Sequence, residues 1–376
     1  MNQTTLTKSW LRPRNLFLLT SAVLVLGAGC KKDHEQGETN FNNLGKFRQQ
    51  NLIANKTSYN PTLRDSSLQN AWGLAFSSGG TPWVNSTNGH VSEVYTADGA
   101  IARAGVYIPS PADSTHGAPT GVVFCGGKGF KLPNNQAANF LFVGEDGVLS
   151  GWNGAAGNYA FRLKNNSTTS SYTGLALAAK GNANYIYAAN FKAKRIDVWD
   201  TTFSAVTMAF TDPGIPSNYA PFNIQAIGTS LYVAYAKVGS DGDEVKEAGA
   251  GYVSIFNTDG SFVKRLTSGG KLNAPWGVAQ APAGFVDDNT TGGTHVDKDQ
   301  PTILVGNFGD GRINIFSMDG TFLGQMRSND QTIAINGLWA LSFAPSTATT
   351  VDPNRLYFTA GPADETDGLF GYLIRQ

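Results

Sequence analysis

The sequence predicts an all-β fold, a six-bladed β-propeller, and three observations support this prediction. A short motif, most often Trp-Gly or Thr-Gly, opens an apolar strand at six places, and successive openings lie 48, 53, 50, 53 and 63 residues apart. Intervals of this length that hold several short strands are typical of propeller blades. The 44 glycines and the 11% of aromatic residues suit tight turns and packing between sheets. The opening residues are Trp72, Thr120, Thr173, Asn223, Trp276 and Trp339.

Alternating apolar residues and turn dipeptides divide the repeats into about four strands each. In the first repeat the predicted strands are 72–76, 82–85, 91–95 and 103–108. The fifth repeat has the same order, with predicted strands at 276–280, 302–306, 312–316 and 321–326. This regularity predicts four strands in every blade.

The sixth repeat shows only three strands, which we expect at 339–343, 355–359 and 369–373. We predict that residues 50–55, just before the first repeat, supply its fourth strand. Such an exchange closes the ring and removes two exposed sheet edges. A ring of seven blades would need another repeat, and none is visible.

The N-terminus reads as a targeting signal. Basic residues precede an apolar stretch, 16–26, which is shorter than the roughly 20 residues needed to span a bilayer. Small residues then lead into Cys30, and the segment resembles a bacterial lipoprotein signal. An ordinary secretory signal with an incidental cysteine is the alternative. The predicted organisation is a signal peptide at 1–29, a flexible tether at 30–48 and the propeller at 49–376.

Lipidation of Cys30 implies a protein outside the cytoplasm, held at the bacterial outer membrane by its acyl chains alone. The run Lys31-Lys32-Asp33, followed by further acidic residues, resembles the surface-export signal of some Bacteroidetes lipoproteins, which implies a place on the cell surface. Cys125, the one other cysteine, lies in an apolar strand and is expected to be a small buried residue.

Composition and motifs exclude several functions. The net charge is zero, so non-specific attraction to nucleic acid is not expected. The chain has no Gly-x-Ser-x-Gly elbow, no His-Glu-x-x-His motif and no P-loop. If a histidine acts as a base, His116 is the best candidate, because its segment precedes an innermost strand; a solvated histidine is the alternative.

A ring of aligned residues is expected at one mouth of the central channel. The second strand of each repeat ends in a small residue followed by an aligned one, at the end of the blade where the first strand opens. Aromatic, amide and hydroxyl groups there suit a small polar ligand, a glycan or a peptide. Blade-to-blade packing is the alternative for the tryptophans. The predicted ligand-binding residues are Trp72, Ser86, Thr120, Glu145, Asp146, Thr173, Asn190, Asn223, Tyr235, Trp276, Asn307 and Trp339.

A metal ion on the axis is a further hypothesis. Glu145, Asn190 and Asn307 offer oxygen ligands that suit Ca²⁺ or Mg²⁺, and six-bladed lactonases hold a metal in a similar way. The acidic insertions 239–251 and 286–300 are predicted to be solvated surface loops, with calcium binding as the alternative.

Several long motifs resemble an uncharacterised family of secreted bacterial proteins, and more distantly NHL-type blades. The resemblance covers about residues 50–373 and implies no established activity. The family usually has Asp at the place of Ser86 and His near the place of Asp367, and both departures argue against a metal or acid–base site here. The motifs are Asn70–Phe76, Ala220–Gln225, Ala274–Ala279, Ala281–Phe285, Leu304–Gly311, Gly337–Trp339 and Tyr357–Pro362.

The sequence therefore predicts a lipid-anchored propeller, expected to be a monomer, that binds a small molecule, a glycan or a protein partner at one channel mouth. An enzyme is the second hypothesis, either a metal-dependent lactonase-like hydrolase or a propeller-type lyase, with Glu145, Asn190 and Asn307 as its motive. A purely structural interaction ring is the third, because a propeller fold alone does not set a function.

Overall fold

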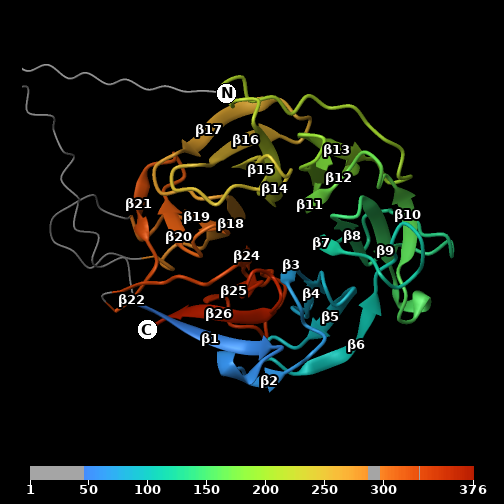
Figure 1. Ribbon diagram of the computed structural model, residues 1–376, viewed down its shortest axis with the longest axis horizontal. Helices are drawn as coiled ribbons and strands as arrows, with labels where there is room; N and C mark the ends of the chain where they lie inside the picture. The colour runs from blue at the N-terminus through green and yellow to red at the C-terminus, as the bar shows by residue number, and fades with distance from the viewer. Residues whose placement is uncertain (1–45, 287–296, 330) are drawn as a thin grey trace, which may run out of the picture. The chain divides into compact units, whose positions relative to one another are not determined.

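The computed structural model describes residues 46–286, 297–329 and 331–376, all within the compact unit Asn40–Gln376. Six small antiparallel sheets surround a common axis, so the predicted six-bladed β-propeller is confirmed (Figure 1). The signal peptide, Cys30 and most of the tether lie outside the described residues, as does most of the loop 286–300. Within the described ranges, no helix has the length and apolar character needed to cross a bilayer.

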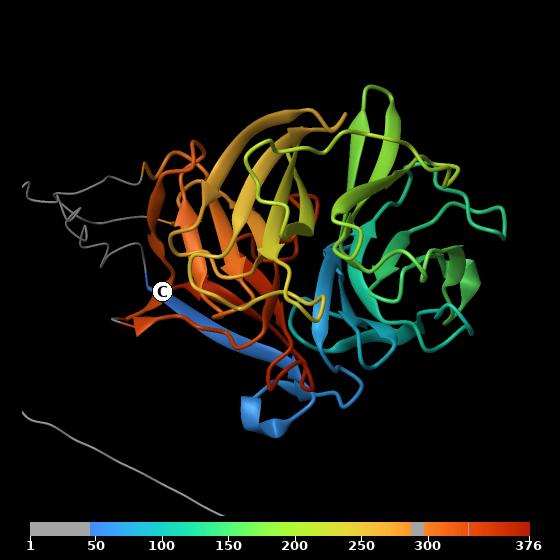
Figure 2. The same cartoon turned by 45° about the horizontal axis from the view of Figure 1, so that its top comes forward.

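Each blade starts with its innermost strand and runs outward, as Figures 1 and 2 show. Blade 1 contains β3 (Ala71–Phe76), β4 (Pro82–Ser86), β5 (Val91–Tyr95) and β6 (Ile101–Tyr107). Blade 2 contains β7 (Pro119–Phe124), β8 (Phe140–Gly144), β9 (Val148–Trp152) and β10 (Phe161–Asn165). Blade 3 contains β11 (Tyr172–Lys180), β12 (Ala183–Asn190) and β13 (Arg195–Trp199).

The remaining blades complete the ring. Blade 4 contains β14 (Tyr219–Ile227), β15 (Ser230–Lys237), β16 (Tyr252–Asn257) and β17 (Phe262–Ser268). Blade 5 contains β18 (Pro275–Ala281), β19 (Thr302–Asn307), β20 (Ile313–Phe316) and β21 (Phe322–Gln325). Blade 6 contains β24 (Leu338–Ser342), β25 (Arg355–Ala360), β26 (Leu369–Arg375) and the N-terminal strand β1 (Phe47–Ala54). Short elements outside this plan are β2 (Leu63–Arg64), β22 (Arg327–Ser328), β23 (Gln331–Thr332) and the 3₁₀ helices η1 (Thr57–Tyr59) and η2 (Gly154–Ala156).

Strand β1 closes the ring, which confirms the predicted exchange. It pairs antiparallel with β26, from Phe47 opposite Arg375 to Ala54 opposite Leu369. Its apolar side chains enter the blade, and Ile53 and Ala54 are fully buried. Just beyond it, Asp367 accepts hydrogen bonds from Tyr59 Oη (2.6 Å) and Asn55 Nδ2 (3.1 Å) and forms an ion pair with Lys56 (2.8 Å). The two ends of the chain are therefore joined by a sheet and by a polar cluster.

The prediction of four strands in every blade is wrong for blade 3, which has three. After β13 the chain returns beside it only briefly, where Val206 N donates to Val198 O (2.9 Å). Beyond that point Val206, Met208 and Phe210 pack against the apolar cluster between blades 3 and 4, and the Phe210 ring lies 5.3 Å from that of Phe256. Apolar packing toward blade 4 thus takes the place of a fourth ladder.

The recurrent Trp-Gly and Thr-Gly motif has a steric cause. A Cβ added to Gly73 would collide with the carbonyl oxygen of Thr120 in the next blade, and one added to Gly121 would lie 2.5 Å from Leu175 N. Gly174 and Gly277 likewise lie against the opening residues of the following blades. Innermost strands converge toward the axis, so these glycines give the backbone room where neighbouring blades approach most closely.

Candidate functional site at the channel mouth

The opening residues and the aligned second-strand residues lie at the same end of the blades. The antiparallel register pairs Ala71 with Ser86 and Tyr172 with Asn190. Pro275 pairs with Asn307 in the same way in blade 5. The loops that follow the second strands therefore surround one entrance of the channel, which we call the mouth.

An aromatic cluster closes the channel behind the mouth. The rings of Trp72 and Trp339 stack with centroids 3.6 Å apart, and the Phe308 ring also stacks on Trp339, at 3.9 Å. Trp276 meets both tryptophans edge-on, at 6.5 and 5.8 Å. All three indoles are at most 5% exposed. These tryptophans therefore pack against one another between blades. We call the group of Trp72, Trp276, Trp339 and Phe308 the aromatic plug.

The small polar residues of the predicted ring join neighbouring blades. Thr120 Oγ1 donates to Tyr172 O (2.6 Å), which links blades 2 and 3. Asn223 Nδ2 donates to Trp276 O (2.8 Å), which links blades 4 and 5. Trp276 Nε1 in turn donates across the channel to Thr173 O (2.9 Å). Their polar atoms are thus used inside the ring, where each bond satisfies a buried group.

Three further predicted residues fix the turns of their own blades. Ser86 Oγ donates to Ser67 O (2.6 Å) and accepts from Gln69 N (2.8 Å). Asn190 Oδ1 accepts from Ala193 N (3.0 Å), and Asn307 Nδ2 donates to Lys271 O (2.8 Å).

Asn190 and Asn307 each donate a hydrogen bond to a carboxylate of their own blade, Asn190 Nδ2 to Asp197 Oδ2 (2.7 Å) and Asn307 Nδ2 to Asp310 Oδ1 (3.0 Å). Within residues 46–286, 297–329 and 331–376, no group of three or more His, Cys, Asp or Glu side chains has an arrangement able to hold a metal. Tyr235 is also buried, and burial raises its pKa. An ion on the axis stays a prediction of the sequence.

Carboxylates from three alternate blades converge at the mouth. Glu145 follows β8 in blade 2, Glu244 lies in the β15–β16 loop of blade 4, and Glu365 lies in the β25–β26 loop of blade 6. Crowding by protein atoms, followed by repulsion from Glu365, raises the pKa of Glu145 to about 7, although solvent still reaches this side chain. Desolvation and repulsion from Glu365 likewise raise the pKa of Glu244 to about 7.

A protonated amine of the protein already lies among these carboxylates. Lys246 Nζ stands 4.5 Å from the centroid of the Phe308 ring, which belongs to the aromatic plug. Its charge lowers the pKa of Glu244 and Glu365 and opposes the upward shift that burial causes. Glu365 also accepts a hydrogen bond from Asn70 Nδ2 (2.9 Å), whose Oδ1 accepts from Trp339 Nε1 (2.9 Å). Glu365 is thus connected to the aromatic plug through Asn70, and Lys246 through its contact with Phe308.

Behind the plug, the axis holds a small cavity of about 30 Å³. A buried water needs roughly 10–15 Å³, so the cavity has room for about one or two waters. All six innermost strands contribute to its wall, through residues that include Gly73, Gly121, Leu175, Asn223, Val278 and Leu341.

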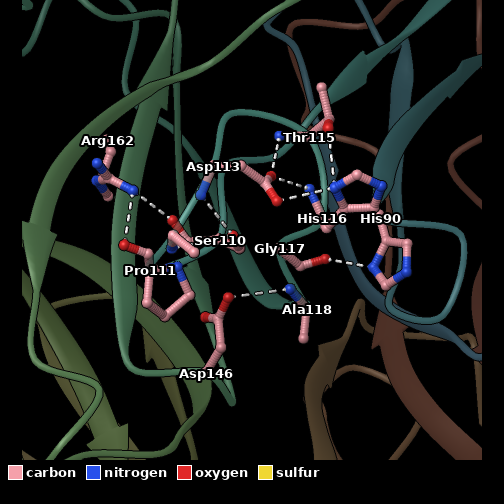
Figure 3. Close-up of polar contacts among 11 residues, drawn as sticks. His90, Ser110, Pro111, Asp113, Thr115, His116, Gly117, Ala118, Asp146 and Arg162 are labelled. Carbon is pink, nitrogen blue, oxygen red and sulfur yellow. Dashed lines mark hydrogen bonds and ion pairs between the residues drawn. The ribbon is translucent and has the colours of Figure 1, made fainter.

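Two histidines lie on the rim of the mouth (Figure 3). His116 Nδ1 lies 3.0 Å from Asp113 Oδ2, and its ring is 5.7 Å from that of His90 at an angle of 69°. The N–H groups of Thr115 and His116, with the imidazole, lower the pKa of Asp113 to about 2. Asp146 stands next to this segment and accepts from Ala118 N (3.3 Å). Desolvation raises the pKa of Asp146.

Sequence reasoning identified Glu145 and Asp146 as members of the mouth and His116 only as a candidate base, and it missed Glu244, Glu365 and His90. Glu244 lies in an insertion interpreted as a solvated loop, and Glu365 lies four residues beyond the aligned position of its blade. Comparing the acidic residues in the loops of alternate blades would have been the signal for Glu244 and Glu365. The extra residues of these two loops displace the carboxylates from the repeat pattern.

Comparisons with known proteins give relatives without an assigned activity. No family model matches the chain. The chain is 34% identical over 330 residues to "Uncharacterized protein L690" of Acanthamoeba polyphaga mimivirus, covering 83% of this chain and 82% of that protein. "Uncharacterized protein R648" of the same virus is 31% identical over 346 residues, covering 86% and 79%. A solved streptogramin B lyase is 12% identical with a TM-score of 0.48, covering 88% of this chain and 97% of that one.

Proposed function

The chain belongs to the family of the mimivirus proteins L690 and R648, and from the residues at its mouth we propose that it binds a small, positively charged ligand there. The observation that carries the proposal is the convergence of Glu145, Glu244 and Glu365 in front of the aromatic plug. Glu365 repels both Glu145 and Glu244, and a bound cation relieves such repulsion.

Lys246 supports an ammonium as the ligand's charged group. Its amine lies against the face of Phe308, and aromatic faces attract cations. The side chain belongs to the exposed β15–β16 loop, so it acts as a tethered competitor for the same place. A free amine that displaces it gains both the ring contact and the carboxylates.

We expect putrescine, a diammonium, to bind at the mouth, and 1,4-butanediol, its uncharged analogue, not to bind. Glu145→Gln, Glu244→Gln and Glu365→Gln are each expected to weaken putrescine binding by roughly tenfold, the equivalent of about 1.4 kcal/mol. Binding should strengthen from pH 6 to pH 8, because Glu145 and Glu244, with pKa values of about 7, ionise over this range. Isothermal titration calorimetry measures all these changes.

A matched control is available on the same loop. Glu247 forms an ion pair with Lys237 (2.6 Å), so Glu247→Gln should leave putrescine binding unchanged. Lys246→Met removes the tethered amine and should strengthen binding. Equal binding of 1,4-butanediol, or unchanged affinity in the three glutamine variants, contradicts the proposal.

General acid–base catalysis at the same mouth is the second candidate. Its support is that Glu145 and Glu244 both have pKa values of about 7, and catalytic acids and bases work best when their pKa lies near the operating pH. A hydrolase or lyase of this kind would convert a bound amine rather than only hold it. Mass spectrometry of candidate amines after incubation, with Glu145→Gln as the inactive reference, distinguishes catalysis from binding.

We also propose that Cys30 carries a lipid anchor and that the protein is a monomer outside the cytoplasm. We further propose that it is one of the secreted bacterial proteins that its motifs resemble. The support is the basic, apolar and small-residue order before Cys30. In a bacterial host, wild-type protein is expected to incorporate radiolabelled palmitate and to sediment with membranes. Cys30→Ser should abolish both, whereas Cys125→Ser should abolish neither, because Cys125 is buried in blade 2. Labelling of the Cys30→Ser variant contradicts lipidation.

A further inference from the structure

His90 and His116 come from separate segments and are held rigidly. His90 ends the turn between β4 and β5 with a positive φ of 62°, and its backbone oxygen accepts from Ile108 N (3.0 Å). His116 lies in the link between β6 and β7, where Gly117 N donates to Ile108 O (2.9 Å). His90 and Gly117, the residue after His116, thus both bond to the backbone of Ile108, which brings the two segments side by side.

Each ring has one nitrogen engaged by an oxygen that only accepts at neutral pH. His90 Nδ1 lies 2.8 Å from Gly117 O, and His116 Nδ1 lies 3.0 Å from Asp113 Oδ2. A carbonyl and an ionised carboxylate have no hydrogen to donate, so they favour the tautomer with the proton on Nδ1. The Thr115 hydroxyl also lies 3.1 Å from His116 Nδ1. With the proton on Nδ1, the lone pair of each ring is on Nε2. Figure 3 shows both Nε2 atoms on the side away from Gly117 and Asp113.

This is the arrangement of metal-binding histidines, which usually donate their second N–H to a carbonyl or carboxylate. Two imidazoles bound through Nε2 at about 2.0–2.1 Å from a tetrahedral ion have centroids roughly 5 Å apart. The observed centroid separation is 5.7 Å, and the His116 side chain is 67% exposed, so its ring has room to turn toward a shared ion. Imidazole nitrogen suits Zn²⁺, Cu²⁺ and Ni²⁺, whereas Ca²⁺ and Mg²⁺ prefer oxygen.

We propose that His90 and His116 together bind one divalent transition-metal ion through their Nε2 atoms on the rim of the mouth. Within the part of the chain that the structure describes, no third His, Cys, Asp or Glu completes the set, so water fills the remaining positions. Asp113 is a positioning residue that orients His116. Asp113 and the nearby Asp146 add negative charge that favours the ion. The site is separate from the proposed ammonium site and stands without it.

Titration of the purified protein with ZnCl₂ tests the proposal. Calorimetry is expected to show one Zn²⁺ at this site, with affinity reduced at least about tenfold in His116→Ala and in His90→Asn. Asparagine is chosen at position 90 because it tolerates a positive φ. His295→Ala, which changes a histidine elsewhere in the sequence, should leave Zn²⁺ binding unchanged.

Copper supplies a readout that a structural defect does not reproduce. With CuCl₂ in place of zinc, the electron paramagnetic resonance spectrum of the wild-type protein should show coupling to two imidazole nitrogens, and that of His116→Ala to one. Asp113→Asn should keep both couplings and weaken affinity about tenfold. Unchanged Zn²⁺ affinity in both histidine variants overturns the proposal, as does loss of binding in a Glu145→Gln, Glu244→Gln, Glu365→Gln triple variant alone.

Discussion

Replacing Trp339 with alanine is expected to lower the free energy of unfolding by about 3–5 kcal/mol, the usual cost of removing a large buried aromatic side chain. Trp339 is fully buried and lies between Trp72 and Phe308 in the aromatic plug, with stacked rings on both faces. The plug contains residues of several blades, so the cavity left by the indole is shared across the ring. Urea unfolding followed by circular dichroism measures the loss.

A pair of phenylalanine variants separates packing from hydrogen bonding. Trp339 Nε1 donates to Asn70 Oδ1 (2.9 Å), whereas Trp72 Nε1 has no hydrogen-bond partner among the described residues. Trp339→Phe should therefore cost more than Trp72→Phe, by about 1 kcal/mol. If Trp339→Ala unfolds at the same urea concentration as the wild-type protein, the plug does not stabilise the ring.

Replacing Asp367 with alanine is expected to lower the free energy of unfolding by about 2–3 kcal/mol, because charged hydrogen bonds are strong and the partly buried Asn55 and Tyr59 would lose their acceptor. The carboxylate is nearly buried and receives three donors from the segment that follows β1. The substitution removes the polar cluster that joins the segment after β1 to the β25–β26 loop. Cleavage near β1 by a protease at low concentration should therefore become faster.

The pH dependence of stability gives an independent check. Burial acts to raise the pKa of Asp367, but hydrogen bonds from Lys56, Tyr59 and Asn55 outweigh it and hold the pKa below its ordinary value. Stability from this group is therefore present above the unfolded pKa, near 4, and is lost as the pH falls through the lower folded pKa. The difference in unfolding free energy between wild-type protein and Asp367→Asn should shrink at acidic pH. A constant difference from pH 7 to pH 3 contradicts this assignment.

The fold was predictable because its steric requirement repeats along the chain. Where innermost strands converge, a glycine is needed beside the next blade, and Gly73, Gly121 and Gly277 mark that need in the sequence. Closure by β1 was also predictable, because the sixth repeat has one strand too few. Blade 3 departed from the pattern because Met208 and Phe210 find better burial against blade 4, and strand periodicity carries no information about that choice.

The site was predictable only in part. Glu145 adjoins the repeat, so alignment placed it correctly beside the mouth, whereas Glu244 and Glu365 lie in loops of unequal length. Alignment identified Trp276 and Asn223 as equivalent positions but not which way their polar atoms point. Both turned out to bond to another blade, Asn223 to Trp276 O of the neighbouring blade 5 and Trp276 to Thr173 O of blade 3. Two of the three carboxylates proposed to bind a ligand, Glu244 and Glu365, thus lie at positions that the repeat does not determine.

The stacked indoles of Trp72 and Trp339 block the central channel behind the mouth. Behind them the axis holds a space of about 30 Å³, enough for about one or two water molecules. A ligand at the proposed carboxylate site would therefore approach and leave on one face of the ring, past the loops of blades 2, 4 and 6 that carry Glu145, Glu244 and Glu365.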